Sequence, residues 1–305
     1  MGILSTELVR HCLKFNYLGK IAFMLENEIK RAVAQALNED LAGLDPSEGD
    51  ITAKLIPETQ QIVAQVITRE ECILAGKAWV SETFAQLDKH IQLEWFYRDG
   101  ERVRAGQTLF RVSGHARSIL TGERSALNFL QTLSATATHV ADCVKELEGT
   151  STQLLDTRKT LPGMRLAQKY AVTCGGGKNH RMGLFDAYLI KENHILACGS
   201  IAAAVNKARE LNPELPVEVE VESLDELNQA LSANANIIML DNFSVPMIAK
   251  AVQLNSGKSK LEVSGNITKI RLAELAETGV DYISSGALTK NVQAIDLSLR
   301  VVSFT

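Results

Sequence analysis

The residues best suited to chemistry lie in a basic stretch near the middle of this sequence. Seven lysines and arginines lie from Arg158 to Lys191, against the single acid Asp186, in a chain whose net charge is −4. A guanidinium matches the two oxygens of a carboxylate or phosphate, and an ammonium places a compact charge beside a phosphate. The run Gly175-Gly176-Gly177 lets backbone amides approach a ligand closely. The stretch predicts a site for an anionic substrate, formed by Arg158, Lys159, His180, Arg181 and Lys191.

Two carboxylates, Glu220 and Asp241, each end a short apolar run of strand type. Paired carboxylates at one edge of a sheet can hold a divalent cation through its water ligands, bind sugar hydroxyls, or act as acid and base. Together with the cationic stretch, they favour a ligand that carries a metal-bound phosphate. Glu218 and Glu222 alternate with Glu220, and we expect both to flank the site or to face outward.

Two Ser-Gly turns come later in the chain, Ser264-Gly265-Asn266 and Ser285-Gly286-Ala287, each just before a helical segment. Free amides at such turns bind phosphate, and the last two strand-helix loops of a parallel barrel are the common phosphate site. The spacing of a Walker loop or of G-x-G-x-x-G is absent from the sequence. His115, His139 and His194 lack a partner at metal-ligand spacing, so we expect core or surface positions for them.

The elements that position these residues are short apolar runs alternating with helical segments. The runs are 154–159, 187–191, 216–220, 237–241, 261–265 and 282–286, and the segments 201–211, 224–231 and 270–277 have a helical period. Buried strands that alternate with helices predict a parallel sheet. The carboxyl ends of such strands open on one face, where a closed barrel collects its reactive groups.

The first part of the chain mixes helix and strand. Residues 29–41 and 78–87 have a helical period, whereas 62–67, 91–97 and 107–112 are strand-like. An uncharged helix opens at Glu123-Arg124-Ser125, and the alternating segment 296–304 is expected to return as a strand. We therefore predict an α+β open-sandwich domain over residues 1–128, completed by 292–305, and an α/β barrel with the active site over 129–291.

Composition narrows the class of protein. The chain has 305 residues, of which 46% are apolar and 22% charged, as in ordinary globular proteins. The net charge of −4 argues against partners such as nucleic acid or an anionic membrane. The longest uncharged stretch, 125–141, is polar and shorter than the ~20 apolar residues of a membrane span. Five scattered cysteines without a C-x-x-C pair, and no visible secretory signal, predict reduced thiols in a cytoplasmic protein.

A series of ordered motifs resembles the quinolinate phosphoribosyltransferases, also called carboxylating nicotinate-nucleotide pyrophosphorylases. The motifs are Asp50-Ile51-Thr52, Glu123-Arg124 with Leu127-Asn128, Thr157-Arg158-Lys159-Thr160, Tyr170-Ala171-Val172 before the triple glycine, Asn179-His180-Arg181, Leu189-Ile190-Lys191-Glu192-Asn193-His194, Glu218-Val219-Glu220 and Leu240-Asp241-Asn242. The resemblance runs from about Ile29 to Arg300. Ser125, Ala135 and Asn266 stand where the family commonly has Thr, Gly and a second Gly, and none of these departures removes a reactive group.

The resemblance implies a fold and a reaction. The fold is an open α/β sandwich followed by an irregular seven-stranded α/β barrel, of which the sequence shows six strands. The reaction joins quinolinate to 5-phosphoribosyl-1-pyrophosphate with the help of Mg²⁺. It yields nicotinate mononucleotide, pyrophosphate and carbon dioxide, a step in de novo NAD biosynthesis.

The resemblance also implies a role for each candidate residue. The substrate-binding residues are Arg124, Arg158, Thr160, His180, Arg181, Ser264, Gly265, Asn266, Ser285, Gly286 and Ala287, and the catalytic residues are Lys159, Lys191, Glu220 and Asp241. Within these sets, Arg158, His180 and Arg181 bind the pyridine carboxylates, and the lysines neutralise pyrophosphate and substrate charge. The acids hold ribose hydroxyls and Mg²⁺, and the two Ser-Gly turns take the 5-phosphate. Arg124 comes from a neighbouring subunit, which implies a homodimer or a larger assembly of dimers.

Two other functions stay open at this point. A related phosphoribosyltransferase could use another aromatic acid such as nicotinate, whose single carboxylate would leave one arginine superfluous. A protein that senses a phosphosugar or nucleotide without catalysis could also have kept the barrel. A sensor need not retain the whole set of Arg158, Lys191, Glu220 and Asp241, so their presence together favours the enzyme.

Overall fold

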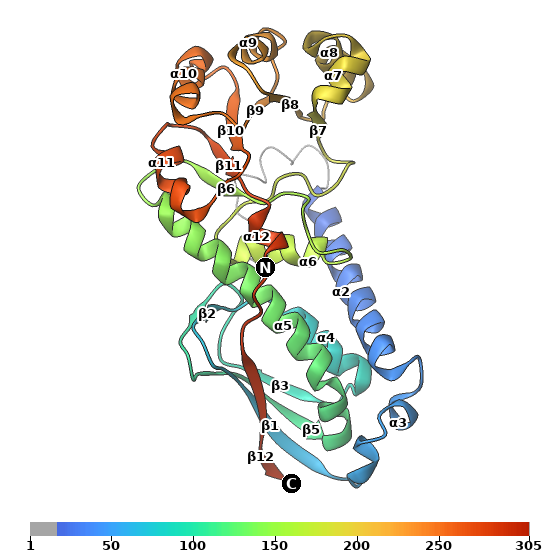
Figure 1. The fold of residues 1–305 in the computed structure, drawn as a ribbon. Helices are drawn as coiled ribbons and strands as arrows, with labels where there is room; N and C mark the ends of the chain where they lie inside the picture. The colour runs from blue at the N-terminus through green and yellow to red at the C-terminus, as the bar shows by residue number, and fades with distance from the viewer. Residues whose placement is uncertain (1–16, 305) are drawn as a thin grey trace. The chain divides into compact units, whose positions relative to one another are not determined.

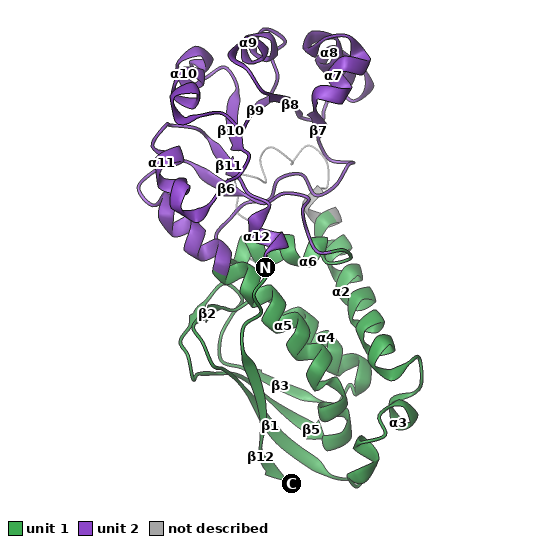
Figure 2. Cartoon of the chain, in the orientation of Figure 1, with its two compact units in different colours: residues 1–138, 162–175, 292–305 green, residues 139–161, 176–291 purple. Residues whose placement is uncertain are grey.

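The computed structural model describes residues 17–304, with side chains described from residue 21 onward. It divides into two compact units (Figure 2): unit 1 comprises 1–138, 162–175 and 292–305, and unit 2 comprises 139–161 and 176–291. The predicted domain boundary at 128/129 falls inside helix α5 (Ala116–Val144), and the two units part within the same helix after Thr138. The segment 162–175, which includes α6 (Arg165–Cys174), groups with unit 1.

Unit 1 is built on an antiparallel sheet of order β12-β1-β5-β3 (Figure 1). Its strands are β1 (Gln61–Thr68), β3 (Gln92–Trp95), β5 (Thr108–His115) and β12 (Leu297–Phe304). Along β1, half-buried and buried residues alternate without a break, as expected of a sheet that covers a core with one face. The C-terminal strand β12 pairs with β1, so that Ile62 lies opposite Phe304.

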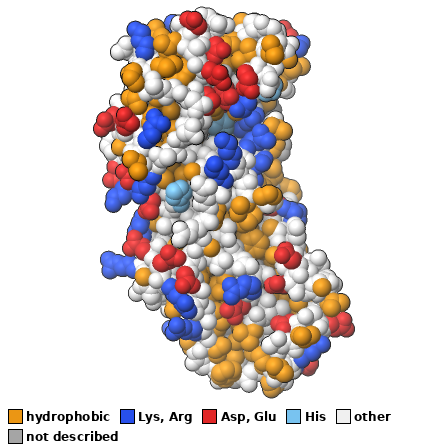
Figure 3. Space-filling view, in the orientation of Figure 1, with side chains coloured by type: hydrophobic (Ala, Val, Ile, Leu, Met, Phe, Trp, Pro, Cys, Tyr) orange, Lys and Arg blue, Asp and Glu red, His pale blue; other side chains and the backbone are white. Residues whose placement is uncertain are grey.

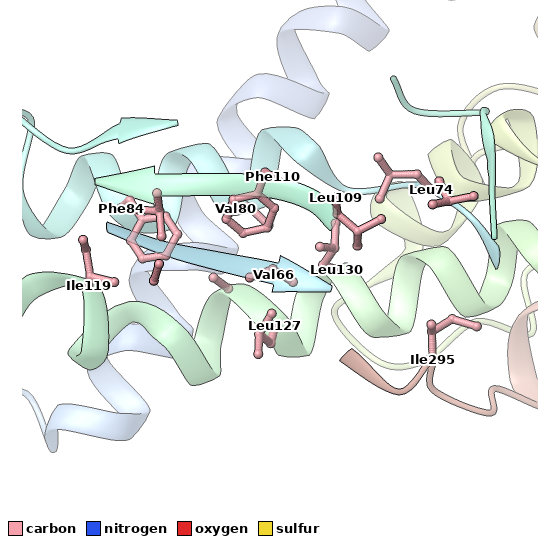
Figure 4. Packing of buried hydrophobic residues seen from close by; sticks show 14 of the residues in the cluster. Val66, Leu74, Val80, Phe84, Leu109, Phe110, Ile119, Leu127, Leu130 and Ile295 are labelled. Atoms are coloured by element: carbon pink, nitrogen blue, oxygen red, sulfur yellow. The ribbon is translucent and has the colours of Figure 1, made fainter. Parts of the chain in front are cut away.

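Helices and a small ribbon complete unit 1. They are α2 (Tyr17–Leu41), α3 (Pro46–Gly49), η1 (Ala53–Leu55), α4 (Lys77–Leu87), and the ribbon of β2 (Cys72–Ile73) with β4 (Arg102–Val103). Figure 4 shows the apolar core, in which Phe84 from α4 and Phe110 from β5 lie near Leu127 of α5. Helix α5 begins at Ala116, earlier than the predicted opening at Glu123.

Unit 2 contains a parallel sheet of six strands in the order β6-β11-β10-β9-β8-β7. The strands are β6 (Gln153–Leu155), β7 (Tyr188–Ile190), β8 (Val217–Val221), β9 (Ile237–Asp241), β10 (Lys260–Ser264) and β11 (Tyr282–Ser284). Each lies within or beside one of the six apolar runs of the sequence. The predicted class, an α/β fold in which a sheet domain precedes a barrel-like parallel domain, is confirmed.

The helices of unit 2 follow the strands in the manner of crossover connections. They are α7 (Glu192–Cys198), α8 (Ile201–Leu211), α9 (Leu224–Ser232), α10 (Val245–Asn255), α11 (Leu272–Ala276) and α12 (Ala287–Lys290), with the short turns η2 (Lys145–Leu147) and η3 (Lys269–Arg271). A single parallel bridge joins Leu155 of β6 to Lys178. The glycine-rich segment 176–181 thus occupies the edge of β6 where a seventh strand would pair.

Two further facts concern the described residues as a whole. Within residues 17–304, no helix combines the length and the apolar character needed to cross a bilayer. Four of the five cysteines, Cys72, Cys143, Cys174 and Cys198, lie in this part of the chain and carry free thiols.

Candidate active site

A pocket of about 990 Å³ opens on unit 2 where the carboxyl ends of the parallel strands meet. Figure 3 shows acidic and basic side chains gathered side by side on this unit. The structure brings together most of the predicted site residues in the lining, namely Arg158, Lys159, His180, Arg181, Lys191, Glu220, Asp241, Ser264, Gly265, Asn266, Ser285, Gly286 and Ala287. Residues far apart in the sequence therefore surround one space.

Two predicted residues do not line this pocket among the residues described. Thr160 is half-buried in the loop after β6, next to Lys159. Arg124 is an exposed residue of α5 within unit 1. The assignment of both to substrate binding stays a prediction.

The pocket has a cationic part formed by Arg158 and Arg181. Burial lowers the pKa of the Arg181 guanidinium, and the positive charge of Arg158 lowers that pKa further. The Arg158 Nε is buried and finds no hydrogen-bond acceptor in the described part of the chain. Because a buried donor without an acceptor is costly, two desolvated guanidiniums favour the binding of an anion that supplies oxygens.

A buried carboxylate that sequence reasoning missed, Asp156, positions this cationic part. Asp156 is fully buried and accepts hydrogen bonds from Asn179 Nδ2 at 2.6 Å and from the His180 backbone N–H at 2.9 Å. The backbone of Lys178 exchanges hydrogen bonds with Leu154 and Asp156, at 2.8 and 3.1 Å. Together these bonds fix the segment that leads to Arg181 against the end of β6. A charged residue directly after an apolar run was the signal that could have revealed it.

Three of the four predicted catalytic groups, Lys191, Glu220 and Asp241, lie at the ends of β7, β8 and β9. Lys191 Nζ donates to Glu220 Oε2 at 2.5 Å, so these two side chains form an ion pair. Asp241 ends β9, the neighbour of β8, and accepts a hydrogen bond from Asn242 Nδ2 at 2.8 Å. Glu220 and Asp241 therefore present carboxylate oxygens, the ligands that Mg²⁺ prefers, from adjacent strands to one pocket.

The two Ser-Gly turns need glycine for steric reasons. At Gly265 the backbone has a φ of +95°, and a Cβ there would overlap the side chain of Asn242. At Gly286 a Cβ would come within 2.6 Å of Lys159 Cδ, so the glycine makes room for the lysine. Thr289 Oγ1 also donates to the Lys159 carbonyl at 2.9 Å. The turn before α12 and the loop that carries Lys159 are thus held together.

A buried cluster of His180, Glu218 and Glu262 lies at the base of the pocket. His180 Nε2 lies 2.9 Å from Glu218 Oε2 and 3.5 Å from Glu262 Oε2, and both glutamates are almost fully buried. The expectation that Glu218 could face outward is therefore wrong, although Glu218 does not itself line the pocket. Residues two apart on a strand share a face, so Glu218 points inward as Glu220 does. Glu222, beyond the strand, is exposed as expected.

His139 also lines the pocket, in place of the core or surface position expected for it. It lies on the part of α5 that belongs to unit 2, one turn before Cys143, which lines the pocket as well. Burial lowers the pKa of the His139 imidazole and raises the pKa of the Cys143 thiol to about 11. Both groups are therefore neutral at physiological pH, and they form an uncharged part of the wall.

Family models match most of the described chain, from residue 50 to residue 300. The model described as "Quinolinate phosphoribosyl transferase, C-terminal domain" matches residues 136–300, and the corresponding N-terminal domain model matches residues 50–134. The two matches meet within α5 and together include every residue of the pocket lining.

Individual relatives agree with the family models. The chain is 40% identical over 258 residues to a "Probable nicotinate-nucleotide pyrophosphorylase [carboxylating]" of Bacillus subtilis, which covers 84% of this chain and 89% of that protein. It is 39% identical over 296 residues to "Quinolinate phosphoribosyltransferase [decarboxylating] 2b, mitochondrial" of Nicotiana tabacum, covering 90% and 82%. Among solved structures, the nicotinate-nucleotide pyrophosphorylase from Francisella tularensis is similar at a TM-score of 0.85 with 54% identity, covering 90% of this chain and 96% of that one.

Proposed function

Because the chain belongs to the quinolinate phosphoribosyl transferase family, we propose that it makes nicotinate mononucleotide for de novo NAD biosynthesis. It transfers the phosphoribosyl group of 5-phosphoribosyl-1-pyrophosphate to quinolinate and releases pyrophosphate and carbon dioxide. The observation that carries the proposal is that one pocket contains both the guanidiniums of Arg158 and Arg181 and the carboxylates of Glu220 and Asp241. A pyridine dicarboxylate fits the two guanidiniums, and ribose hydroxyls together with a divalent cation fit the two carboxylates.

At the cationic part, the guanidiniums of Arg158 and Arg181 bind the two carboxylates of quinolinate. The unsatisfied Nε–H of Arg158 is a donor available to one carboxylate oxygen. The two guanidiniums, each bound to one carboxylate, fix the plane of the pyridine ring so that its nitrogen faces the ribose. Such positioning of the reacting atoms supplies much of the rate acceleration. Nicotinate has one carboxylate and would leave one guanidinium unpaired in a desolvated pocket, which disfavours it.

At the sugar end, Glu220 and Asp241 accept hydrogen bonds from ribose hydroxyls, and Lys159 and Lys191 balance the charge of the departing pyrophosphate. Lys191 is held by Glu220, so the ammonium is already placed before substrate arrives. The turns at Ser264 and Ser285 take the 5-phosphate. The ring nitrogen attacks the anomeric carbon as pyrophosphate leaves, and the resulting pyridinium stabilises the carbanion left by carbon dioxide. That carbanion then takes a proton from solvent water, which completes nicotinate mononucleotide. No covalent bond to the protein is needed.

The residues fit Mg²⁺ as the metal of this reaction. Glu220 and Asp241 offer hard oxygen donors on neighbouring strands of the pocket, a set suited to a hydrated divalent cation. Magnesium bound there would neutralise charge on the pyrophosphate leaving group. We expect pyrophosphate release to fall to background in excess chelator and to return when Mg²⁺ is restored.

The assay that tests the function measures two products from one mixture. With 5-phosphoribosyl-1-pyrophosphate and Mg²⁺, quinolinate labelled at its 2-carboxylate should release labelled carbon dioxide and pyrophosphate in equal amounts. Nicotinate is the comparison substrate. Pyrophosphate release from nicotinate without a response to quinolinate would favour the related transferase, and tight binding of the phosphosugar without turnover would favour a sensor.

The assembly we propose is a homodimer in which Arg124 acts across the subunit interface. Arg124 is exposed on unit 1, whereas the pocket belongs to unit 2, so a residue supplied by a neighbouring molecule is compatible with its exposure. Arg124→Ala and Lys159→Ala variants should each be inactive as homodimers. After subunit exchange, each heterodimer should regain one intact site out of two, and failure to regain any activity would refute a shared site.

We place the reaction in the cytoplasm. The described cysteines are free thiols on separate elements, which is typical of proteins of a reducing compartment. Fractionation of the native cells, followed by the pyrophosphate assay on each fraction, tests this location.

A further inference from the structure

The cluster beneath the cationic part contains polar atoms that the proposed reaction leaves unexplained. One nitrogen of His180 and one oxygen each of Glu218 and Glu262 lie within 4.8 Å of one another. Three buried oxygens of these glutamates, and the buried hydroxyl oxygen of Ser284, have no hydrogen-bond partner in the described part of the chain. They are Glu218 Oε1, Glu262 Oε1, Glu262 Oε2 and Ser284 Oγ. A His-Glu-Glu group with unsatisfied oxygens could hold either a metal ion or a proton.

The tautomer of His180 decides between these two occupants. The backbone N–H of Arg181 donates to His180 Nδ1 at 2.7 Å, so Nδ1 acts as the acceptor. A neutral imidazole whose Nδ1 accepts must carry its proton on Nε2. That proton points to Glu218 Oε2, 2.9 Å away. With its Nε2 protonated, His180 cannot ligate a metal, and the ring brings no positive charge to the glutamates.

The charges of the two glutamates then require a proton. Glu218 accepts from a neutral histidine, and Glu262 lies close to it with a side chain that is fully buried. Two carboxylates this close in a dry environment do not both ionise. Burial and the charge of Glu218 raise the pKa of Glu262 from 4.5 to about 8. His180 Nε2 lies nearer to Glu218 than to Glu262, and Glu262 is the more deeply buried of the two, so the proton shared by the pair belongs on Glu262.

We propose that Glu262 is a positioning residue that carries a proton at neutral pH and thereby keeps the charges of Arg158 and Arg181 available to a dianionic substrate. The charge of Glu218 already acts on Arg181. With Glu262 neutral, the two positive charges of Arg158 and Arg181 exceed the single negative charge of Glu218 beneath them. A second carboxylate would cancel that excess and attract the guanidiniums toward the base of the pocket. The role assigned here to quinolinate rests on the proposed function.

Other titratable groups surround Glu262 and enter the same balance. From the neighbouring elements these are Glu218 and Glu220 on β8, Asp241 on β9, Tyr282 on β11, Arg158 and Lys159 after β6, and His180 and Arg181 on the segment 176–181. Burial raises the pKa of Tyr282, with contributions from Glu262 and Glu218, so its phenol stays neutral over the same range.

The first measurement detects the proton directly and needs no turnover. The infrared spectrum of the wild-type protein at pH 7 should contain a carbonyl band of a protonated carboxylic acid that disappears as the pH rises past about 8. Glu262→Gln should lack this band. Glu222→Gln, which alters an exposed glutamate, should keep it. Absence of the band from the wild-type protein would overturn the proposal, whether or not quinolinate proves to be the substrate.

The second measurement tests the effect on substrate. Above about pH 8, the fraction of Glu262 that keeps its proton falls roughly tenfold per pH unit, so the wild-type KM for quinolinate should rise up to tenfold per pH unit. In Glu262→Gln, whose amide imitates the neutral acid, that rise should be absent while kcat keeps its own pH profile. Glu222→Gln should follow the wild type. A KM that rises equally in wild type and Glu262→Gln would refute the electrostatic role and leave the proposed reaction intact.

If Glu262→Gln fails to fold, the wild-type infrared titration still decides whether the proton is present. The tautomer is tested in the same protein with nitrogen-labelled histidine, whose Nε2 should bear the proton across pH 6 to 8. A doubly protonated His180 in that range would supply the missing positive charge to Glu218 and Glu262, and would overturn the assignment.

Discussion

Replacing Asp156 by Asn should show how strongly one buried carboxylate determines the cationic part of the pocket. Asp156 accepts from Asn179 Nδ2 at 2.6 Å and from the His180 N–H at 2.9 Å, one bond to each oxygen. An amide keeps only one accepting oxygen. One hydrogen bond to a charged group, worth about 1.5–3 kcal/mol, is lost, and the new amide N–H that faces a donor costs about 1–3 kcal/mol more. We expect the free energy of unfolding to fall by roughly 3–5 kcal/mol.

The assay combines stability with substrate binding. Urea unfolding followed by circular dichroism gives the change in free energy, and steady-state kinetics gives the KM for quinolinate. The backbone N–H of His180 donates one of the two bonds to Asp156, and Arg181 is the next residue. Loss of that support should therefore displace both side chains and raise the KM for quinolinate by tenfold or more, equivalent to about 1.4 kcal/mol. Asp225→Asn is the matched control, because Asp225 is exposed in the first turn of α9 and should change stability by less than about 1 kcal/mol.

A free energy of unfolding that changes by less than about 1 kcal/mol in Asp156→Asn, the worth of one ordinary hydrogen bond, together with an unchanged KM, would contradict this prediction. Such a result would mean that the segment before Arg181 holds its position without the carboxylate. A loss of stability with an unchanged KM would confine Asp156 to a purely structural role.

Two further predictions concern Glu262 and Asp99. Because the pKa of Glu262 is raised in the folded state, that state binds the proton more tightly than the unfolded state does. As the pH rises from roughly 5 to 8, the free energy of unfolding should therefore fall by up to about 1.4 kcal/mol per pH unit more in the wild type than in Glu262→Gln. Equal pH slopes of the two proteins in urea unfolding would contradict this. In unit 1, Tyr170 O–H donates to half-buried Asp99 at 2.6 Å, so Tyr170→Phe should lower the free energy of unfolding by about 1.5–3 kcal/mol. Tyr188→Phe, which removes an exposed hydroxyl, should lose clearly less in the same fluorescence-monitored unfolding.

The sequence predicted unit 2 well because its strands are short apolar runs that end on polar residues. A strand pattern of this kind specifies both the sheet and the edge at which Lys191, Glu220 and Asp241 must meet. The helical segments between the runs then fix the parallel direction of the strands. The motifs of the family added the reaction, which no periodicity could have supplied.

The missed residues share one cause. Glu218 was assigned away from the site although residues two apart on a strand lie on one face. The same rule places Glu262 beneath Ser264, yet a single acid inside an apolar run gave no sign that it would be buried and protonated. Burial of charge depends on neighbours from other strands. It is a property of the assembled sheet and cannot be read from one segment.

The edge of β6 posed a different difficulty. The segment that pairs with it, through Lys178, is rich in glycine and has none of the β-branched residues typical of strands. Its position comes from the hydrogen bonds of Asp156 and Leu154, which join residues more than twenty positions apart. Local propensity therefore gave no indication of it.

The pairing of β12 with β1 has a consequence for biosynthesis. Strand β1 spans Gln61–Thr68, but its partner β12 begins only at Leu297, after every strand of unit 2. During translation, β1 must therefore wait with one edge uncovered until β12 has been synthesised. Exposed strand edges invite pairing with other chains. We expect C-terminal truncations to aggregate as nascent products, even though they remove nothing from the pocket.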